Sequence, residues 1–94
     1  MNVARTILTQ INQLDRMALA AWGAKDFVAT KEGVQFRVGG MAKFKGLVHV
    51  KYDRGSDAYN IDFMKMRKGV PVVTHDCTHI YADNLVNVID MVVQ

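Results

Sequence analysis

Apolar and polar side chains alternate through most of this chain, from about residue 26 to residue 80, and this period of two strongly limits its fold. A β-strand turns successive side chains to opposite faces, so the alternation predicts strands that each bury one face. Glycine-containing segments interrupt the alternation at 30–33, 39–46, 53–56 and 68–69. Such segments close hairpins. The sequence therefore predicts about five short antiparallel strands in a meander.

The fifth of these strands, at about 70–79, contains Pro71. Proline has no backbone N–H to donate, so this strand is expected at a sheet edge. In the fourth strand, which begins near Tyr59 and runs to about Arg67, Met64 and Met66 point away from Ile61 and Phe63 if the strand is regular. The methionines are then either exposed, or lie under the helices while the aromatic residues face outward.

Both ends of the chain show helical periodicity instead. Apolar residues recur at three- and four-residue steps over 2–21, and Gly23 follows where a helix C-terminus favours glycine. A second apolar stripe covers 83–93, with Asp83 as the expected N-cap. We predict a single α+β domain over 1–94, in which two helices pack on one face of the sheet.

Composition limits the cellular setting. Cys77 is the only cysteine, which excludes an internal disulfide and fits a reducing compartment. No stretch reaches the roughly 20 apolar residues of a membrane helix, and the N-terminus lacks the pattern of a signal peptide. The expected location is the cytoplasm, with no membrane partner.

The charges are unevenly distributed. Residues 37–68 carry eight basic and three acidic side chains, whereas residues 69–94 carry only three acidic ones. A basic middle suggests an anionic partner. Lys43 and Lys45 flank Phe44, and cations beside a stacking ring suit single-stranded nucleic acid. The candidate binding residues are Arg37, Lys43, Phe44, Lys45, Lys65, Arg67 and Lys68.

His75, Cys77 and His79 alternate, so a regular strand would place all three on one face. Three ligands in line with no obvious fourth make a poor tetrahedral zinc site, although His49 could in principle complete it. A Cys–His nucleophile needs an oriented base, which the pattern does not provide. Asp53, Asp57 and Asp62, in or beside a turn, give no acid–base pair. We expect no metal, no cofactor and no enzymatic activity; a hydrolase or metal enzyme using the histidines and the cysteine is the alternative.

Four segments, at 23–28, 34–37, 59–69 and 80–85, resemble in sequence and order a group of short open reading frames of phages, prophages and plasmids. Members read as a helix, G-A-K-x-F, a strand with F-x-(R/L), a strand ending in R-x-G, and V-Y-x-D-x-L before the last helix. The resemblance covers about 23–85, although 74–79 departs from the pattern. It implies a mobile-element accessory protein and is silent on activity.

We therefore expect a non-enzymatic binding module of a phage or mobile element. Its sharpest form is an anti-CRISPR-like inhibitor that occludes a surface of a host protein or protein–nucleic-acid complex, and the alternative is a small basic nucleic-acid-binding protein. The last helix is apolar on two sides, and the uncovered sheet face has few charges. Because apolar surface on a small protein marks an interface, we also expect a homodimer.

Overall fold

The computed structural model describes residues 3–40 and 42–94. Two helices, α1 (Val3–Leu14) and α2 (Ala18–Ala21), precede the sheet, and a 3₁₀ turn, η1 (Ala82–Asn84), leads into the final helix α3 (Leu85–Val93). The strands between them are β1 (Lys25–Ala29), β2 (Gly33–Val38), β3 (Gly46–Asp53), β4 (Ala58–Arg67) and β5 (Val70–Ile80).

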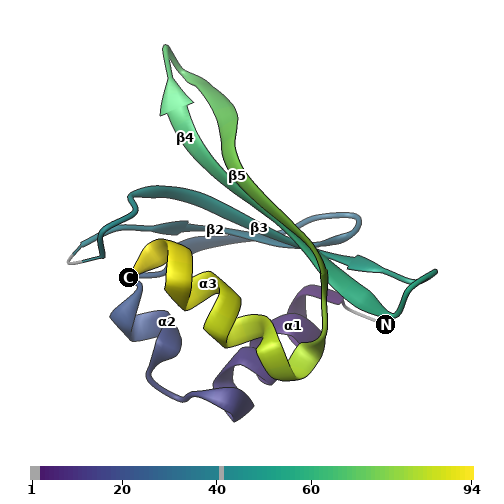
Figure 1. The fold of residues 1–94 in the computed structure, drawn as a ribbon. Helices are drawn as coiled ribbons and strands as arrows, with labels where there is room; N and C mark the ends of the chain where they lie inside the picture. The colour runs from purple at the N-terminus through teal and green to yellow at the C-terminus, as the bar shows by residue number, and fades with distance from the viewer. Residues whose placement is uncertain (1–2, 41) are drawn as a thin grey trace.

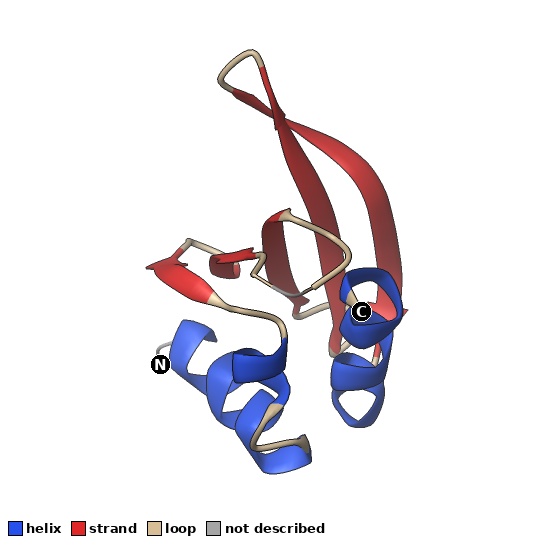
Figure 2. Ribbon diagram, turned by 90° about the vertical axis from the view of Figure 1, so that its left-hand side faces the viewer, coloured by secondary structure: helices blue, strands red, loops and turns tan. Residues whose placement is uncertain are grey.

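The five strands pair in sequence order, each antiparallel to the next. The helices all lie on one side of this sheet, as Figures 1 and 2 show. The predicted α+β class and meander are thus confirmed. Pro71 lies in β5, which is an edge strand, as its missing N–H required.

The core lies between the helices and the covered face of the sheet. Strand residues there include the fully buried Phe36, Val48, Val50, Ile61 and Phe63, and the helices contribute Ile7, Ile11, Trp22, Leu85, Ile89 and Val93. The aromatic side of β4 therefore faces the helices. Met64 is half-buried and Met66 is 48% exposed, which settles the two orientations open from the sequence.

The single helix predicted over 2–21 is wrong in one respect, because the chain leaves the helix after Leu14 and re-enters it at Ala18. The Asp15 carboxylate accepts a hydrogen bond from the backbone N–H of Met17 at 2.9 Å. Such a local bond competes with helical pairing and breaks the run. Residue 2 lies outside the described residues. The predicted end at Gly23 is confirmed by its φ of 63°.

Asp83 is also not the N-cap of the last helix. It lies within η1, and the residue at the N-cap position of α3 is Asn84, whose side chain makes no capping hydrogen bond. The helix is held instead by burial and by contacts to the first helices. The fully buried Trp22 donates its Nε1–H to Asp90 Oδ1 at 3.0 Å, and Gln94 Nε2 donates to Ala21 O at 2.9 Å.

Candidate functional site

The last part of the β4–β5 hairpin leaves the body of the sheet. Met64 is the last β4 residue that pairs with β3, opposite Leu47, and residues 65–67 pair only with 70–72 of β5. Lys68 and Gly69 close the hairpin with φ of 52° and 79°, values typical of a type I′ turn. Figure 1 shows this two-stranded ribbon projecting from the molecule. We call residues 65–72 the arm.

A basic hollow of about 500 Å³ lies at the root of the arm. Its lining brings together four cations that are far apart in sequence, from β2, the β2–β3 loop and β4. The lining residues are Arg37, Val38, Lys43, Lys45, Gly46, Lys65 and Met66. Of the seven candidate residues from the sequence, the structure thus gathers four here, and Arg67 and Lys68 lie farther along the arm.

Helix α3 holds the loop that carries two of these cations. The backbone N–H of Phe44 donates to Val93 O at 3.1 Å, and Ala42 N–H donates to Gly39 O at 3.0 Å. Gly46 lies so close to β4 that a Cβ at this position would be 2.2 Å from Met64 O. Only glycine fits this approach. The loop is therefore fixed against both α3 and the base of the arm.

Phe44 does not lie where a stacking ring is needed. Its side chain is 6% exposed and packs edge-on against Phe63, with ring centroids 5.9 Å apart. Lys65 Nζ lies 5.5 Å from the centre of the same ring, a cation–π contact. The expectation of an exposed aromatic between two lysines is therefore wrong. The buried ring anchors the loop and places Lys65 over it.

Most of the cations around the hollow and along the arm have no carboxylate partner among the described residues. Within the described residues, the only ion pair of the hollow joins Arg37 Nε to Asp26 Oδ2 at 3.5 Å. No ion pair in that part of the chain involves Lys43, Lys45, Lys65, Arg67 or Lys68. The segments 37–52 and 63–75 contain no acidic residue at all. We call these six cations, Arg37, Lys43, Lys45, Lys65, Arg67 and Lys68, the basic cluster.

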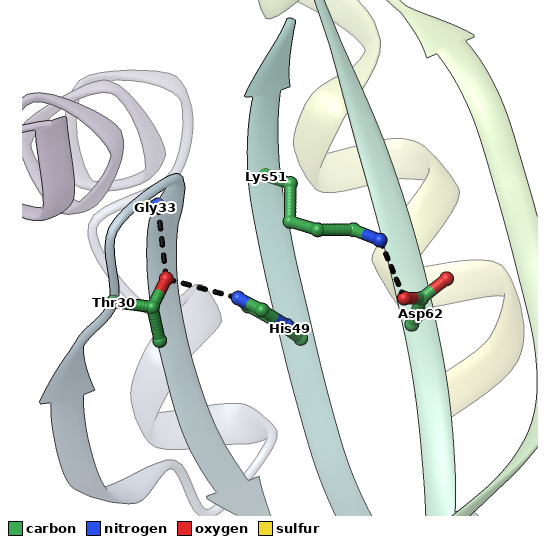
Figure 3. A network of polar contacts seen from close by, with 5 residues as sticks. All are labelled: Thr30, Gly33, His49, Lys51 and Asp62. Atoms are coloured by element: carbon green, nitrogen blue, oxygen red, sulfur yellow. Dashed lines mark hydrogen bonds and ion pairs between the residues drawn. The ribbon is translucent and has the colours of Figure 1, made fainter.

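The open face of the sheet, opposite the helices, is organised differently, as Figure 3 shows. Lys51 Nζ lies 2.7 Å from Asp62 Oδ2, and both side chains are about three-quarters buried. Asp62 is therefore a strand residue in an ion pair, not a turn residue. Thr30 Oγ1 accepts the N–H of Gly33 at 3.0 Å and lies 3.0 Å from His49 Nε2. Burial lowers the pKa of His49, and Lys51 lowers it further.

His75, Cys77 and His79 do not share one face. His75 and Cys77 keep regular register opposite Phe63 and Ile61, but the pairing is irregular after Cys77, and His79 has a φ of 57°. Cys77 pairs with Ile61 and Ile80 with Tyr59, so the alternation ends between them. His49 contacts Thr30 near the opposite edge of the sheet. Among residues 3–40 and 42–94, no three potential ligand side chains of His, Cys, Asp or Glu gather at one place.

Sequence reasoning missed a second hollow, of about 540 Å³, beside the β3–β4 turn. Tyr52 and Tyr59 lie opposite each other in the ladder and line it, with ring centroids 5.6 Å apart. The Tyr59 hydroxyl donates to Gln10 Oε1 and the Tyr52 hydroxyl to Asp57 Oδ1. Desolvation raises the pKa of Tyr59. The sequence feature that could have indicated this hollow is the pair of tyrosines that flank a short turn.

Exposed apolar side chains gather on the arm and its base, which the sequence did not indicate. Met66, Val70, Val72 and Val73 are each at least 40% exposed. On α3, by contrast, Val86, Val88 and Val92 pack against the core and only Met91, at 83%, is a large exposed apolar residue. The open sheet face carries the Lys51–Asp62 pair. Both surfaces proposed for a dimer are thus less apolar than the sequence suggested.

No helix within the described part of the chain is long and apolar enough to cross a membrane. Comparisons of the chain with protein-family models, with curated proteins and with solved structures give no significant match.

Proposed function

We propose that this chain is a non-enzymatic binding module of a phage or other mobile element that acts inside the host cell. In its sharpest form it is an inhibitor of a host defence system, of the anti-CRISPR kind, which covers a surface of a host protein or protein–nucleic-acid complex. The mobile-element setting rests on the resemblance of residues 23–85 to such accessory proteins, which is an argument by analogy.

The arm is the observation that carries a binding role. It projects from the sheet and combines exposed apolar side chains, such as Val70 at 58% exposure, with Lys65 and Arg67 on the paired strand. Exposed apolar groups beside unpaired charges are typical of surfaces that another molecule covers. The potential metal ligands His75, Cys77 and His79 do not gather at one place in the described part of the chain.

Affinity capture from a bacterial host lysate, with and without nuclease, tests this function. The bait variants are Lys43→Glu with Lys45→Glu, and Asp83→Asn as a control of an exposed charge outside the cluster. We expect a host protein that is retained after nuclease and lost with the double variant, because two charges at the root of the arm are reversed. Retention of the same protein by the double variant would contradict the proposal.

Nucleic-acid binding is the second candidate, and the convergence of four cations around one hollow favours it. Arg37, Lys43, Lys45 and Lys65 come from three separate segments, and three of them lack a carboxylate partner within the described residues. Neutralising phosphates and releasing their counterions is the main source of such binding. Recovery of nucleic acid alone, with loss of all bound material after nuclease, would support this candidate over the first.

The homodimer, through α3 or through the open face of the sheet, stays a prediction. The exposed apolar surface of α3 is small, since Val88 and Val92 beside the exposed Met91 are half-buried against the core. Sedimentation equilibrium of the 10.5 kDa chain at hundreds of micromolar should show a dimer that Met91→Glu dissociates. A monomer mass at that concentration would remove the dimer from the proposal and leave the binding role untouched.

A further inference from the structure

We infer that the arm enters the major groove of double-stranded DNA while the cations of the basic hollow hold the adjacent phosphate backbone. This inference deepens the second candidate function and rests on it. It specifies the form of the ligand, a duplex, and the part of the protein that enters it.

The shape of the arm fits a groove. Beyond Met64 the ribbon consists of two strands alone, paired from Lys65 opposite Val72 to Arg67 opposite Val70 and closed by the Lys68–Gly69 turn. The major groove of B-form DNA is about 12 Å wide and admits a two-stranded β-ribbon. Because β3 begins at the base of the arm, with Leu47 opposite Met64, no third strand of the described sheet widens the ribbon there.

The positively charged side chains of the arm and of the hollow form a row that a phosphate backbone could follow. Lys65 and Arg67 follow Ile61 and Phe63 in the alternation of β4, so they lie on the same side as the hollow. Lys65 itself lines the hollow, with Lys43 and Lys45. Cations therefore extend from the root of the arm to its turn, without an acidic residue between 63 and 75. Such a row matches successive phosphates better than a single small anion.

The surface near the arm is suited to a duplex rather than to a single strand. Proteins that hold single strands stack bases on exposed aromatic rings. Phe44, the aromatic residue between Lys43 and Lys45, is 6% exposed, and the ring of His75 nearby packs edge-on against it with centroids 6.4 Å apart. The exposed side chains that accompany the cations are aliphatic: Val70, Val72 and Met66. Aliphatic groups suit contact with sugars and thymine methyl groups in a groove.

The test measures the affinity of the purified protein for a 20-base-pair DNA duplex and for either strand alone, by fluorescence anisotropy in 50–200 mM salt. In the short-arm variant, the two residues Asn-Gly replace residues 66–71, so that a two-residue turn connects Lys65 to Val72. These two residues form a pair of the same ladder type as Arg67 and Val70, so a type I′ turn fits. The matched charge variant is Arg67→Gln with Lys68→Gln in a full-length arm.

We expect the natural chain to prefer the duplex and to lose about a thousandfold in affinity over this salt range, as for roughly six phosphate contacts. The charge variant should lose on the order of fiftyfold at 100 mM salt, from two contacts. The short-arm variant should lose at least tenfold more, because it also lacks the ribbon. Arg16→Gln with Lys31→Gln, two exposed cations outside the cluster, should bind as the natural chain does.

Each other outcome is informative. Equal losses for the short-arm and charge variants, with unchanged circular dichroism, would show that the arm acts by charge alone and would overturn groove entry. Equal affinity for duplex and single strands would overturn the duplex while leaving nucleic-acid binding in place. No salt-dependent binding to any of the three nucleic acids would overturn both this inference and the second candidate function.

Discussion

The open face of the sheet and the basic cluster both carry charge, but they satisfy it in different ways. On the open face, Lys51 and Asp62 form a 2.7 Å pair from adjacent strands, and each is about three-quarters buried. In the cluster, Lys43, Lys45, Arg67 and Lys68 are exposed and make no ion pair with any described residue. The first arrangement is internally complete, whereas the second is complementary to an external anion.

The same sheet therefore carries charged side chains that pair within the protein and charged side chains that do not. In the β3–β4 ladder His49 lies directly opposite Asp62 and Lys51 lies opposite Asn60, so Lys51 is the diagonal neighbour of Asp62, two positions along on the same face. Lys43, Lys45, Lys65, Arg67 and Lys68 have no such neighbour among the described residues, because they lie in a loop held by α3 or on the part of the β4–β5 hairpin that β3 does not reach. Substitutions in the two regions should therefore separate into effects on folding and effects on binding.

The largest expected effect is on folding, at the aromatic residue beneath the cluster. Phe44→Ala should lower the free energy of unfolding by about 3 kcal/mol, because it removes a buried ring that packs on Phe63. Urea denaturation measures this. Phe27→Ala, which removes a ring that is 44% exposed, should cost roughly a third as much. An unchanged midpoint for Phe44→Ala would show that this ring does not stabilise the core and would contradict its assignment as the anchor of the loop.

The next largest expected effect is a difference in stability between a variant of the paired Lys51 and a variant of the unpaired Lys43. Lys51→Gln leaves the Asp62 side chain, about three-quarters buried, without its partner and should cost about 1 kcal/mol of unfolding free energy. Lys43→Gln removes an exposed cation with no ion pair and should change stability by less than about 0.5 kcal/mol. Urea denaturation of the two variants side by side measures both free energies of unfolding. Equal costs would remove the distinction between the two regions.

The smallest expected effect is a pH dependence of the folding stability, caused by His49 on the open face. Burial and the neighbouring Lys51 lower the folded-state pKa of His49. The unfolded chain then binds this proton more readily than the folded one, so stability falls as the pH drops below about 6.5 and levels off below the folded-state pKa. Thermal melts between pH 5 and 8 should show this loss, and His49→Gln should reduce it. The same slope in both proteins would refute the assignment.

The sequence predicted the sheet well and the site less well, for physical reasons. Period-two alternation, glycine turns and Pro71 define the meander and its edge, because these are local requirements of strands. The break at Asp15 and the irregular pairing near His79 depend on local side-chain bonds and backbone angles that periodicity does not report. The cations could be recognised from their number. Their convergence on one hollow, and the burial of Phe44, required the tertiary contacts with α3 and β4.

The central claim is that the cations of the basic cluster other than Arg37 lack a carboxylate partner and bind an anionic partner instead, and its most direct test is elution from immobilised heparin, a general polyanion. Three double variants each remove two positive charges: Lys43→Gln with Lys45→Gln, Arg67→Gln with Lys68→Gln, and the control Arg16→Gln with Lys31→Gln. The account predicts elution of the first two at clearly lower salt than the natural chain, and of the control at nearly the same salt. Equal shifts for all three would show that net charge alone governs the interaction and would contradict the account.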